Sequence, residues 1–195
     1  MKRFFCLILF VFFFSEIPHA QVSRISAGAG LEVAFPAGGD FSNGSSTGYG
    51  FSANIDYDLD ILPLTLTGTL GYLHFGSKSG SNDIFGSYVG ESANVVPLLA
   101  GVKYYLIPNF GLYGTALIGV EFFSFSSDYN PPIAAANSRV TYSTQSATEN
   151  KFAFGLGAGY EVPLSIPGSL DFSMRFMIIN EANTFNIRAG YIYRF

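Results

Sequence analysis

Residues 151–162, with the sequence KFAFGLGAGYEV, decide how this chain folds. Every second position from Phe152 to Val162 carries an apolar or aromatic side chain, and the positions between, from Lys151 to Glu161, are charged or small. Successive side chains of a β-strand point to opposite faces, so the two faces of this segment meet different surroundings. The alternation predicts a strand with one face in an apolar medium.

The same alternation recurs in seven other segments. Together with 151–162, the eight expected strands cover residues 24–35, 49–59, 64–75, 95–106, 112–123, 170–179 and 184–195. Six acids and five bases lie on the strand face opposite the bulky residues. We expect them to form an ionic network inside the fold, because charges withdrawn from water need partners. These residues are Glu32, Asp56, Asp58, Lys103, Glu121, Lys151, Glu161, Asp171, Arg175, Arg188 and Arg194.

The beginning of the chain is typical of a secretory signal peptide. Lys2 and Arg3 precede the apolar run 4–14, and Ala20 ends the segment, so we expect cleavage of residues 1–20 and a mature domain of residues 21–195. A retained anchor helix is the alternative, although the apolar run is shorter than the about 20 residues that a spanning helix needs. The single cysteine, Cys6, lies in this segment, so the mature chain has no thiol chemistry.

Composition excludes several classes of protein. Without Lys2, Arg3 and Glu16 the mature chain keeps 8 basic and 13 acidic residues, a net charge of −5, which excludes a surface that follows a nucleic-acid backbone. Charged residues make up only 12% of the chain, whereas the chain contains 21 Phe and 12 Tyr. Soluble domains carry about 25% charged residues, so this composition disfavours an ordinary aqueous surface.

The connections between the expected strands alternate in length. Segments 36–48, 76–94 and 124–150 are long and polar, whereas 60–63, 107–111 and 163–169 are short and contain Pro; the fourth long position, 180–183, is short and departs from the trend. Transmembrane barrels have short turns on the periplasmic side and longer outer loops, so both termini are expected in the periplasm. No strand edge can stay unpaired in lipid, so the segments must close. We therefore predict an all-β fold, an eight-stranded antiparallel up-and-down transmembrane β-barrel.

The last segment provides a resemblance to a known family. Residues 185–195, FNIRAGYIYRF, end on an aromatic residue and carry apolar or aromatic side chains at every second position before it. This ending resembles that of small eight-stranded outer-membrane barrels such as OmpX and the OmpA transmembrane domain. The resemblance implies that Tyr191, Tyr193 and Phe195 form a signal for the outer-membrane assembly machinery. It also implies residence in the bacterial outer membrane, in contact with its lipid and lipopolysaccharide.

An eight-stranded barrel has an interior that side chains can fill, so a wide pore is not expected. We expect one ionic group near Asp56, Asp58, Lys103, Glu161, Asp171 and Arg194 and a second near Glu32, Glu121, Lys151, Arg175 and Arg188. A narrow, porin-like leak is the alternative, because many inward positions are glycine. Pro97 interrupts an expected strand, which predicts either a bulge there or a strand that starts near Leu98.

The favoured function is a non-enzymatic outer-membrane protein whose loops, 36–48, 76–94 and 124–150, contact a surface ligand. A lipid-acting enzyme centred on His74, with Ser77 nearby, is the first alternative; no other residue is a candidate for catalysis. The second alternative is a soluble lipocalin-like barrel, which would carry its apolar residues inside. No cofactor or metal site is expected.

Overall fold

A computed structural model describes residues 24–59, 62–78, 91–107, 110–129 and 143–195. The expected signal peptide, residues 1–20, lies outside this described part. In chain order the elements are β1 Ile25–Pro36, α2 Gly39–Gly44, β2 Ser45–Leu59, β3 Leu64–Ser77, β4 Glu91–Tyr105, β5 Leu112–Tyr129, β6 Ser143–Pro163, β7 Gly168–Ile179 and β8 Thr184–Arg194.

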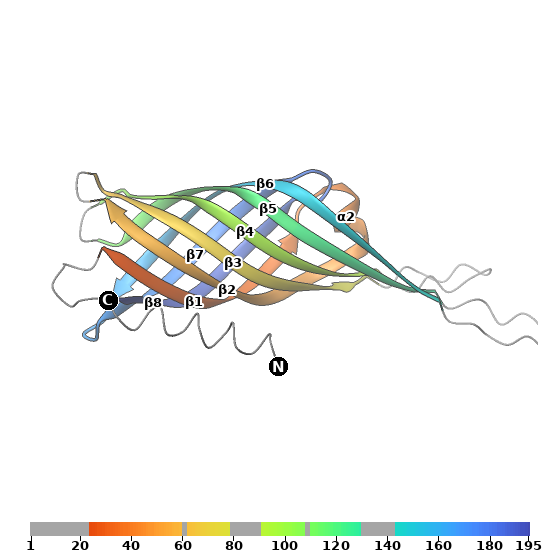
Figure 1. The fold of residues 1–195 in the computed structure, drawn as a ribbon, viewed down its shortest axis with the longest axis horizontal. Helices are drawn as coiled ribbons and strands as arrows, with labels where there is room; N and C mark the ends of the chain where they lie inside the picture. Colours follow the sequence, from red (N-terminus) through yellow and green to blue (C-terminus); the bar gives the residue numbers. More distant parts are fainter. Residues whose placement is uncertain (1–23, 60–61, 79–90, 108–109, 130–142) are drawn as a thin grey trace, which may run out of the picture.

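The eight strands form one closed barrel in which each strand pairs antiparallel with its neighbours in the chain. β1 and β8 close the ring along a ladder that runs from the Ser26–Arg194 pair to the Pro36–Thr184 pair. This architecture confirms the fold class predicted from the alternation. β1 begins and β8 ends at one end of the barrel, here called the terminal end, and α2 lies at the other, the α2 end (Figure 1).

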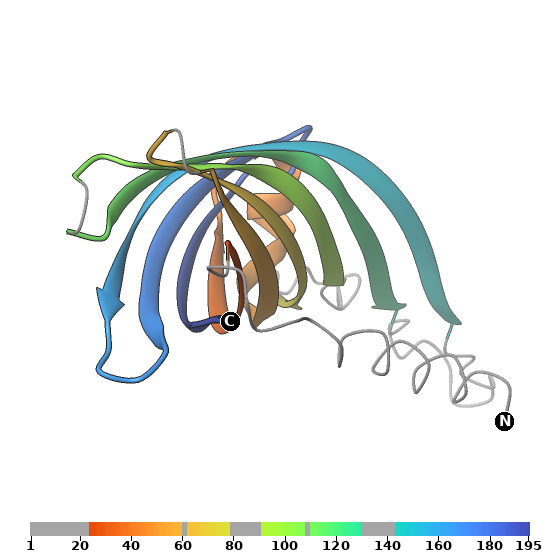
Figure 2. The ribbon, with the colours of Figure 1, turned by 60° about the vertical axis from the view of Figure 1, so that its left-hand side comes forward.

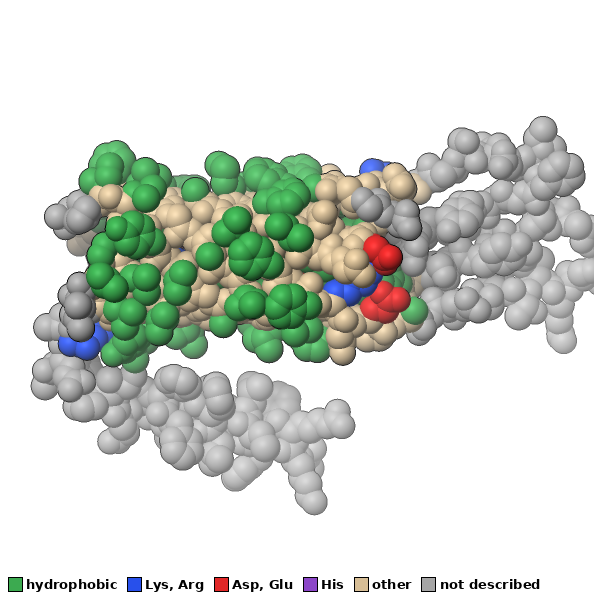
Figure 3. All heavy atoms as spheres, turned by 90° about the horizontal axis from the view of Figure 1, so that it is seen from above, with side chains coloured by type: hydrophobic (Ala, Val, Ile, Leu, Met, Phe, Trp, Pro, Cys, Tyr) green, Lys and Arg blue, Asp and Glu red, His purple; other side chains and the backbone are tan. Residues whose placement is uncertain are grey.

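Large apolar side chains cover the outside of the barrel. Leu31 is 74% exposed, Phe152 64% and Phe51 60%. The face in Figure 3 is covered by such side chains along the barrel wall, and charged side chains appear on it only near the two ends. A lipocalin-like arrangement is therefore wrong for this chain, because its apolar residues would point inward. The outer surface suits acyl chains.

A short helix, α2, occupies the α2 end of the barrel within the expected loop 36–48. The backbone N–H of Phe41 donates to the Glu181 carbonyl at 3.4 Å, and that of Lys78 donates to the Gly44 carbonyl at 2.9 Å, so α2 is tied to the β7–β8 connection and to the end of β3. Figure 2 shows α2 inside the barrel outline. Among the described residues, no helix is long and apolar enough to cross a membrane.

β5 and β6 extend beyond the other strands at the α2 end (Figure 1). The sequence predicted an irregular segment from 124 to 150, but the two strands stay paired from Ser124–Thr148 to Tyr129–Ser143. We call β5 residues 124–129 and β6 residues 143–152 the protruding hairpin. The β6–β7 ladder begins only at the Ala153–Ile179 pair, so in the described part of the chain residues 143–152 pair with β5 alone.

Pro97 lies inside β4, and both explanations offered for it from the sequence are wrong. β4 runs through Pro97, and the pairs Leu70–Leu98 and Leu73–Val95 keep one continuous register on both sides of it, without a bulge. The β3–β4 ladder instead lacks the pairs at Val96 and Pro97. A Cβ atom on Gly71 would lie 3.0 Å from Pro97 Cγ, so the facing glycine makes room for the ring.

Candidate functional site: the lumen and the outer rim

Most of the charged residues on the inward parity lie buried inside the barrel. Eight of the eleven are buried: Glu32, Asp56, Lys103, Glu121, Glu161, Asp171, Arg175 and Arg188. The other three, Asp58, Lys151 and Arg194, keep the inward parity but lie near the ends of the barrel, where they are partly or largely exposed. These three were expected in the interior and are rim residues, because parity specifies a face of the sheet and not a depth along it.

The ionic group at the terminal end centres on Lys103 and Glu161. Lys103 Nζ lies 2.8 Å from Asp56 Oδ2 and 3.5 Å from Glu161 Oε1. Arg194 Nη2 reaches Glu161 Oε2 at 2.7 Å from the rim. Asp58 accepts a 2.5 Å hydrogen bond from the Thr65 hydroxyl. Four of the six residues expected in this group therefore form one connected set.

Arg188 connects several polar side chains in the middle of the lumen. Arg188 pairs with Asp171 and also donates to Asn54 Oδ1 at 2.8 Å and Ser52 Oγ at 3.0 Å. Asp171 also accepts a 2.6 Å hydrogen bond from the Tyr113 hydroxyl. Its grouping with the terminal end was wrong, because its partner is Arg188 and not Lys103. The staggered pairing of tilted strands places residues at heights that the sequence alone does not give.

Arg175 of β7 pairs with Glu32 of β1 across the intervening strand β8. Arg175 Nη2 lies 2.5 Å from Glu32 Oε1, and the Asn186 side-chain amide donates to the same oxygen at 2.8 Å. Among the described residues, Glu32 Oε2, Arg175 Nε and Asn186 Oδ1 have no hydrogen-bond partner. Glu121 is also buried and lies within electrostatic range of Arg175 and Glu32, and its carboxylate makes no hydrogen bond to a described residue. One guanidinium thus serves two carboxylates.

Lys151 belongs to the rim at the α2 end. Its ammonium lies 3.3 Å from Glu149 Oε2 and 3.7 Å from Glu181 Oε2. Both carboxylates are more than half exposed, so water screens these pairs. Lys151 was expected to group with Glu32 and Arg175, and the structure pairs it with these rim residues instead.

The half of the lumen next to α2 is apolar, which sequence reasoning missed. Phe41 of α2 packs edge-on against Phe75 and Phe123, with ring centroids 5.0 and 5.8 Å apart. The surrounding buried cluster is made of Ala34, Leu73, Ala93, Val95, Leu99, Leu117, Ala153, Met177, Ile179 and Ala182. The signal was present in the sequence, because Leu73, Phe75, Val95 and Leu99 place apolar side chains on the inward parity. We call Phe41 and this cluster the apolar plug.

A small polar cavity lies in the middle of the lumen. Its volume is about 30 Å³, and its lining includes Lys103, Tyr113, Asp171, Arg175 and Arg188. A water molecule needs roughly 10–15 Å³ by this measure, so the cavity has room for about two. Such a cavity suits a few bound waters within the ionic network and is too small for a solute path.

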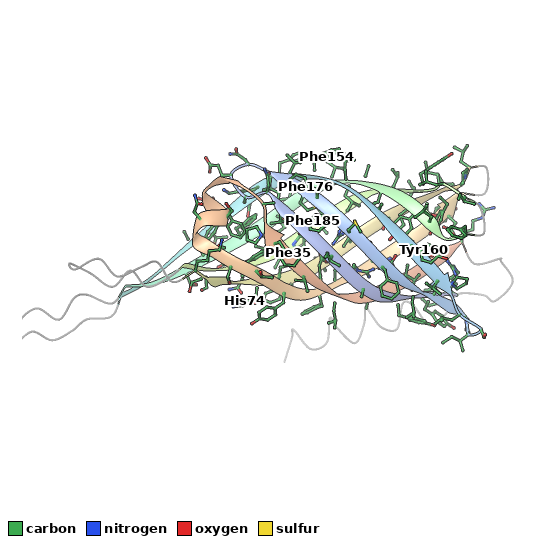
Figure 4. All side chains as sticks on the ribbon, turned by 180° about the vertical axis from the view of Figure 1, so that it is seen from behind. Phe35, His74, Phe154, Tyr160, Phe176 and Phe185 are labelled. Carbon is green, nitrogen blue, oxygen red and sulfur yellow. The ribbon has the colours of Figure 1, made fainter. Side chains whose placement is uncertain are left out.

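His74 lies on the outer face of β3 near the α2 end, whereas Tyr160 lies at the terminal end (Figure 4). His74 Nδ1 lies 2.8 Å from Asn94 Oδ1, and the Tyr72 hydroxyl donates to the same oxygen at 2.8 Å. The Tyr49 ring lies 5.6 Å from the imidazole. Ser77, three residues after His74 in the sequence, makes no hydrogen bond to it. No group of three or more His, Cys, Asp or Glu among the described residues could hold a metal ion.

The aromatic residues of the final strand lie at the terminal end. Tyr193 and Phe195 pack edge-to-face with centroids 5.2 Å apart, and both are exposed on the outer surface. The Tyr191 hydroxyl donates to the Pro167 carbonyl at 3.0 Å. These positions leave the chain end accessible outside the barrel.

A known protein family matches almost the whole chain. A family model described as "outer membrane protein beta-barrel domain" matches residues 4–195. The chain belongs to this family. Membership indicates an integral barrel of the bacterial outer membrane. No curated protein matches the chain.

Solved structures share the fold of this outer-membrane barrel. Ail, the attachment invasion locus protein of Yersinia pestis, is 16% identical with a TM-score of 0.56, over 90% of this chain and 100% of Ail. Ail in complex with the heparin analogue sucrose octasulfate is 13% identical with a TM-score of 0.58, over the same shares. A major outer membrane protein from Thermus thermophilus is 17% identical with a TM-score of 0.56, over 87% of this chain and 99% of that one. At these identities the likeness concerns the fold alone.

Proposed function

We propose that this chain is a non-enzymatic outer-membrane barrel that contacts a surface ligand through its protruding hairpin. The observation that carries the proposal is the outer edge of β6, where residues 143–152 have a strand partner on one side only among the described strands. Such an edge presents unpaired backbone N–H and C=O groups, which an extended segment of another chain can pair with. The ionic network and the apolar plug provide the rigid support beneath it.

The charge of the outer segments limits the kind of ligand. Segments 36–48, 76–94 and 124–150 carry five acids, Asp40, Asp83, Glu91, Asp128 and Glu149, against two bases, Lys78 and Arg139. A net charge of −3 repels sulfated polyanions such as the heparin analogue bound by Ail. A neutral or basic protein segment that adds a strand to β6 fits the hairpin better.

Two adjacent proline substitutions test the edge. Backbone N–H groups alternate sides along a strand, so one of Ala147→Pro and Thr148→Pro removes a donor from the free edge and the other removes one from the β5 ladder. The readout is adhesion of cells displaying the barrel to protein-coated and heparin-coated surfaces, together with their self-aggregation. A third variant joins Ser124 to Thr148 through Asn-Gly and so removes residues 125–147.

We expect adhesion to protein and not to heparin, and we expect the shortened variant and the edge-side proline to abolish it. Unchanged adhesion of the shortened variant, with the barrel still migrating as a folded species on unheated gels, would refute the proposal. Adhesion to heparin alone would refute the argument from charge.

A lipid-acting enzyme centred on His74 is the second candidate, because the His74–Asn94 hydrogen bond could orient an imidazole. Among the described residues, however, no serine or carboxylate hydrogen-bonds to His74. Replacing His74 by Ala and comparing lipid A profiles by mass spectrometry separates the two functions. An altered profile would favour the enzyme.

We also infer that the mature chain, residues 21–195, places both termini in the periplasm after removal of residues 1–20. The support is the length pattern of the connections and the position of β1 and β8 at the terminal end. An affinity tag placed after Phe195 should resist protease added to intact cells and become sensitive after the outer membrane is opened. The N-terminal mass of the purified barrel tests the cleavage.

A further inference from the structure

A row of polar side chains crosses the lipid-facing surface near the α2 end. Tyr49 of β2 is paired with His74 of β3, His74 with Asn94 of β4, and Asn94 with Ser124 of β5. Directly paired residues point to the same side of the sheet, and these four point outward. We call Tyr49, His74, Asn94 and Ser124 the polar row.

The polar row lies at the boundary of the apolar belt. A strand tilted by about 40° rises roughly 2.5 Å per residue along the membrane normal, so the ten steps from Leu64 to His74 span about 25 Å, the height of the apolar band of such barrels. The next row toward the terminal end contains Phe51, Tyr72 and Phe122, which form an aromatic girdle. His74 therefore lies at the level of lipid headgroups.

The row offers donors that the protein does not use. Asn94 Oδ1 takes both internal hydrogen bonds, from the Tyr72 hydroxyl and at His74 Nδ1. Within the described part of the chain, the Asn94 amide N–H groups, His74 Nε2 and the Tyr49 hydroxyl have no partner. Tyr49 is 64% exposed, and His74 and Asn94 are partly exposed, so these groups can be reached from outside the barrel. Polar groups at a lipid-facing position need a partner, which the headgroups of the bilayer can supply.

The chemistry of the row selects the partner. It contains no carboxylate, so a cationic choline or ethanolamine headgroup finds no counter-charge. Its amide, phenol and imidazole groups suit the oxygen acceptors of phosphates and sugar hydroxyls. Lys78, four residues after His74, adds a cation beyond the row; its ammonium donates to the Ser42 carbonyl at 2.6 Å and is exposed.

We propose that the polar row binds the phosphorylated sugar headgroup of an outer-leaflet lipid. The internal hydrogen bonds of Asn94 hold His74 and Tyr72 in place, and the headgroup accepts hydrogen bonds from Asn94 and Tyr49. The lipid is bound without chemical change. The polar row shares Ser124 with the protruding hairpin, but its hydrogen bonds to the headgroup come from Asn94 and Tyr49, so either proposal can fail without the other.

The test measures binding of purified lipid A to the full barrel in detergent by native mass spectrometry. His74→Leu and Asn94→Leu should each weaken binding about tenfold, the effect of losing one or two hydrogen bonds to a charged group. Tyr104→Leu is the matched control, because Tyr104 is an outward tyrosine of β4 at the opposite rim. His74→Gln keeps a group able to bond Asn94 and should retain most of the affinity.

Several results would overturn the assignment. Equal affinity of the wild type and both leucine variants would remove the site, and an equal loss in Tyr104→Leu would make the effect non-specific. Competition by inorganic phosphate at the concentration of lipid A would indicate a small-ion site. Equal binding of phosphatidylglycerol would remove the role of the sugar. Each variant is first checked for the folded, fast-migrating form on unheated gels.

Discussion

The Glu32–Arg175 pair gives the sharpest prediction about stability. Both side chains are buried, at 2% and 6% exposure, and their closest atoms are 2.5 Å apart. Arg175→Met removes the guanidinium and keeps an unbranched apolar chain in its place. The variant removes the ion-pair partner of the Glu32 carboxylate, which keeps its hydrogen bond from the Asn186 amide, and it removes the Arg175 charge that acts on Glu121.

The expected cost follows from burial. Removing one partner of a buried ion pair costs about 3–5 kcal/mol, because the other charge stays uncompensated. We expect about 4 kcal/mol here, close to a thousandfold in the folding equilibrium constant. Lys151→Met is the matched control. Its partners are more than half exposed, so the loss should stay below about 1 kcal/mol.

The assay is urea unfolding of the barrel in phosphatidylcholine vesicles, followed by far-ultraviolet circular dichroism, since the chain has no tryptophan. Adding Glu32→Leu to Arg175→Met should restore part of the loss, because the stranded carboxylate is gone. Equal costs for Arg175→Met and Lys151→Met would refute the reasoning. They would mean that the lumen screens charge as well as the rim does.

Three further predictions concern closure, packing and assembly. The wild-type barrel should show no steady conductance in planar bilayers, whereas Phe75→Ser combined with Phe123→Ser should conduct, because the apolar plug is opened; a conducting wild type would contradict the plug. Gly119→Ala should lower the yield of folded barrel, since its Cβ would lie 2.1 Å from the Leu98 carbonyl oxygen, whereas Gly68→Ala meets nothing within 4 Å and should fold normally; equal yields on unheated gels would exclude this cause. Deleting Phe195 should reduce the amount of barrel recovered in outer-membrane fractions, and undiminished recovery would argue against an assembly signal there.

Sequence periodicity predicted all eight strands and the inward parity of the charges, because lipid and lumen impose opposite demands on alternate residues. It missed the protruding hairpin for the same reason. Residues 124–129 and 143–150 extend past the apolar belt and are rich in Ser and Thr, so their two faces meet similar surroundings and the alternation loses contrast. These residues pair with one another because they continue strands β5 and β6, and no apolar alternation in the sequence marks them.

Pairing partners inside the lumen were harder to predict than the faces. Asp171 was grouped with Lys103, but it pairs with Arg188, because the stagger between tilted strands sets relative heights. The apolar plug was missed because inward positions were read by their charges alone. The position of Phe41 in the lumen could not be predicted for another reason. α2 is a six-residue helix in a polar loop, and it is held by tertiary contacts that no local sequence pattern encodes.

The lumenal ion pairs have a consequence for insertion into the bilayer. Glu32 on β1 is bonded to Arg175 on β7 and to Asn186 on β8, so these contacts cross the β1–β8 seam. While the sheet is still open, the same charges face each other across a gap or meet acyl chains. Each unpaired charge then costs free energy, and a partly closed sheet gains no stabilisation from the ionic network. Closure should therefore be all-or-none, and the seam strands should gain amide-exchange protection simultaneously.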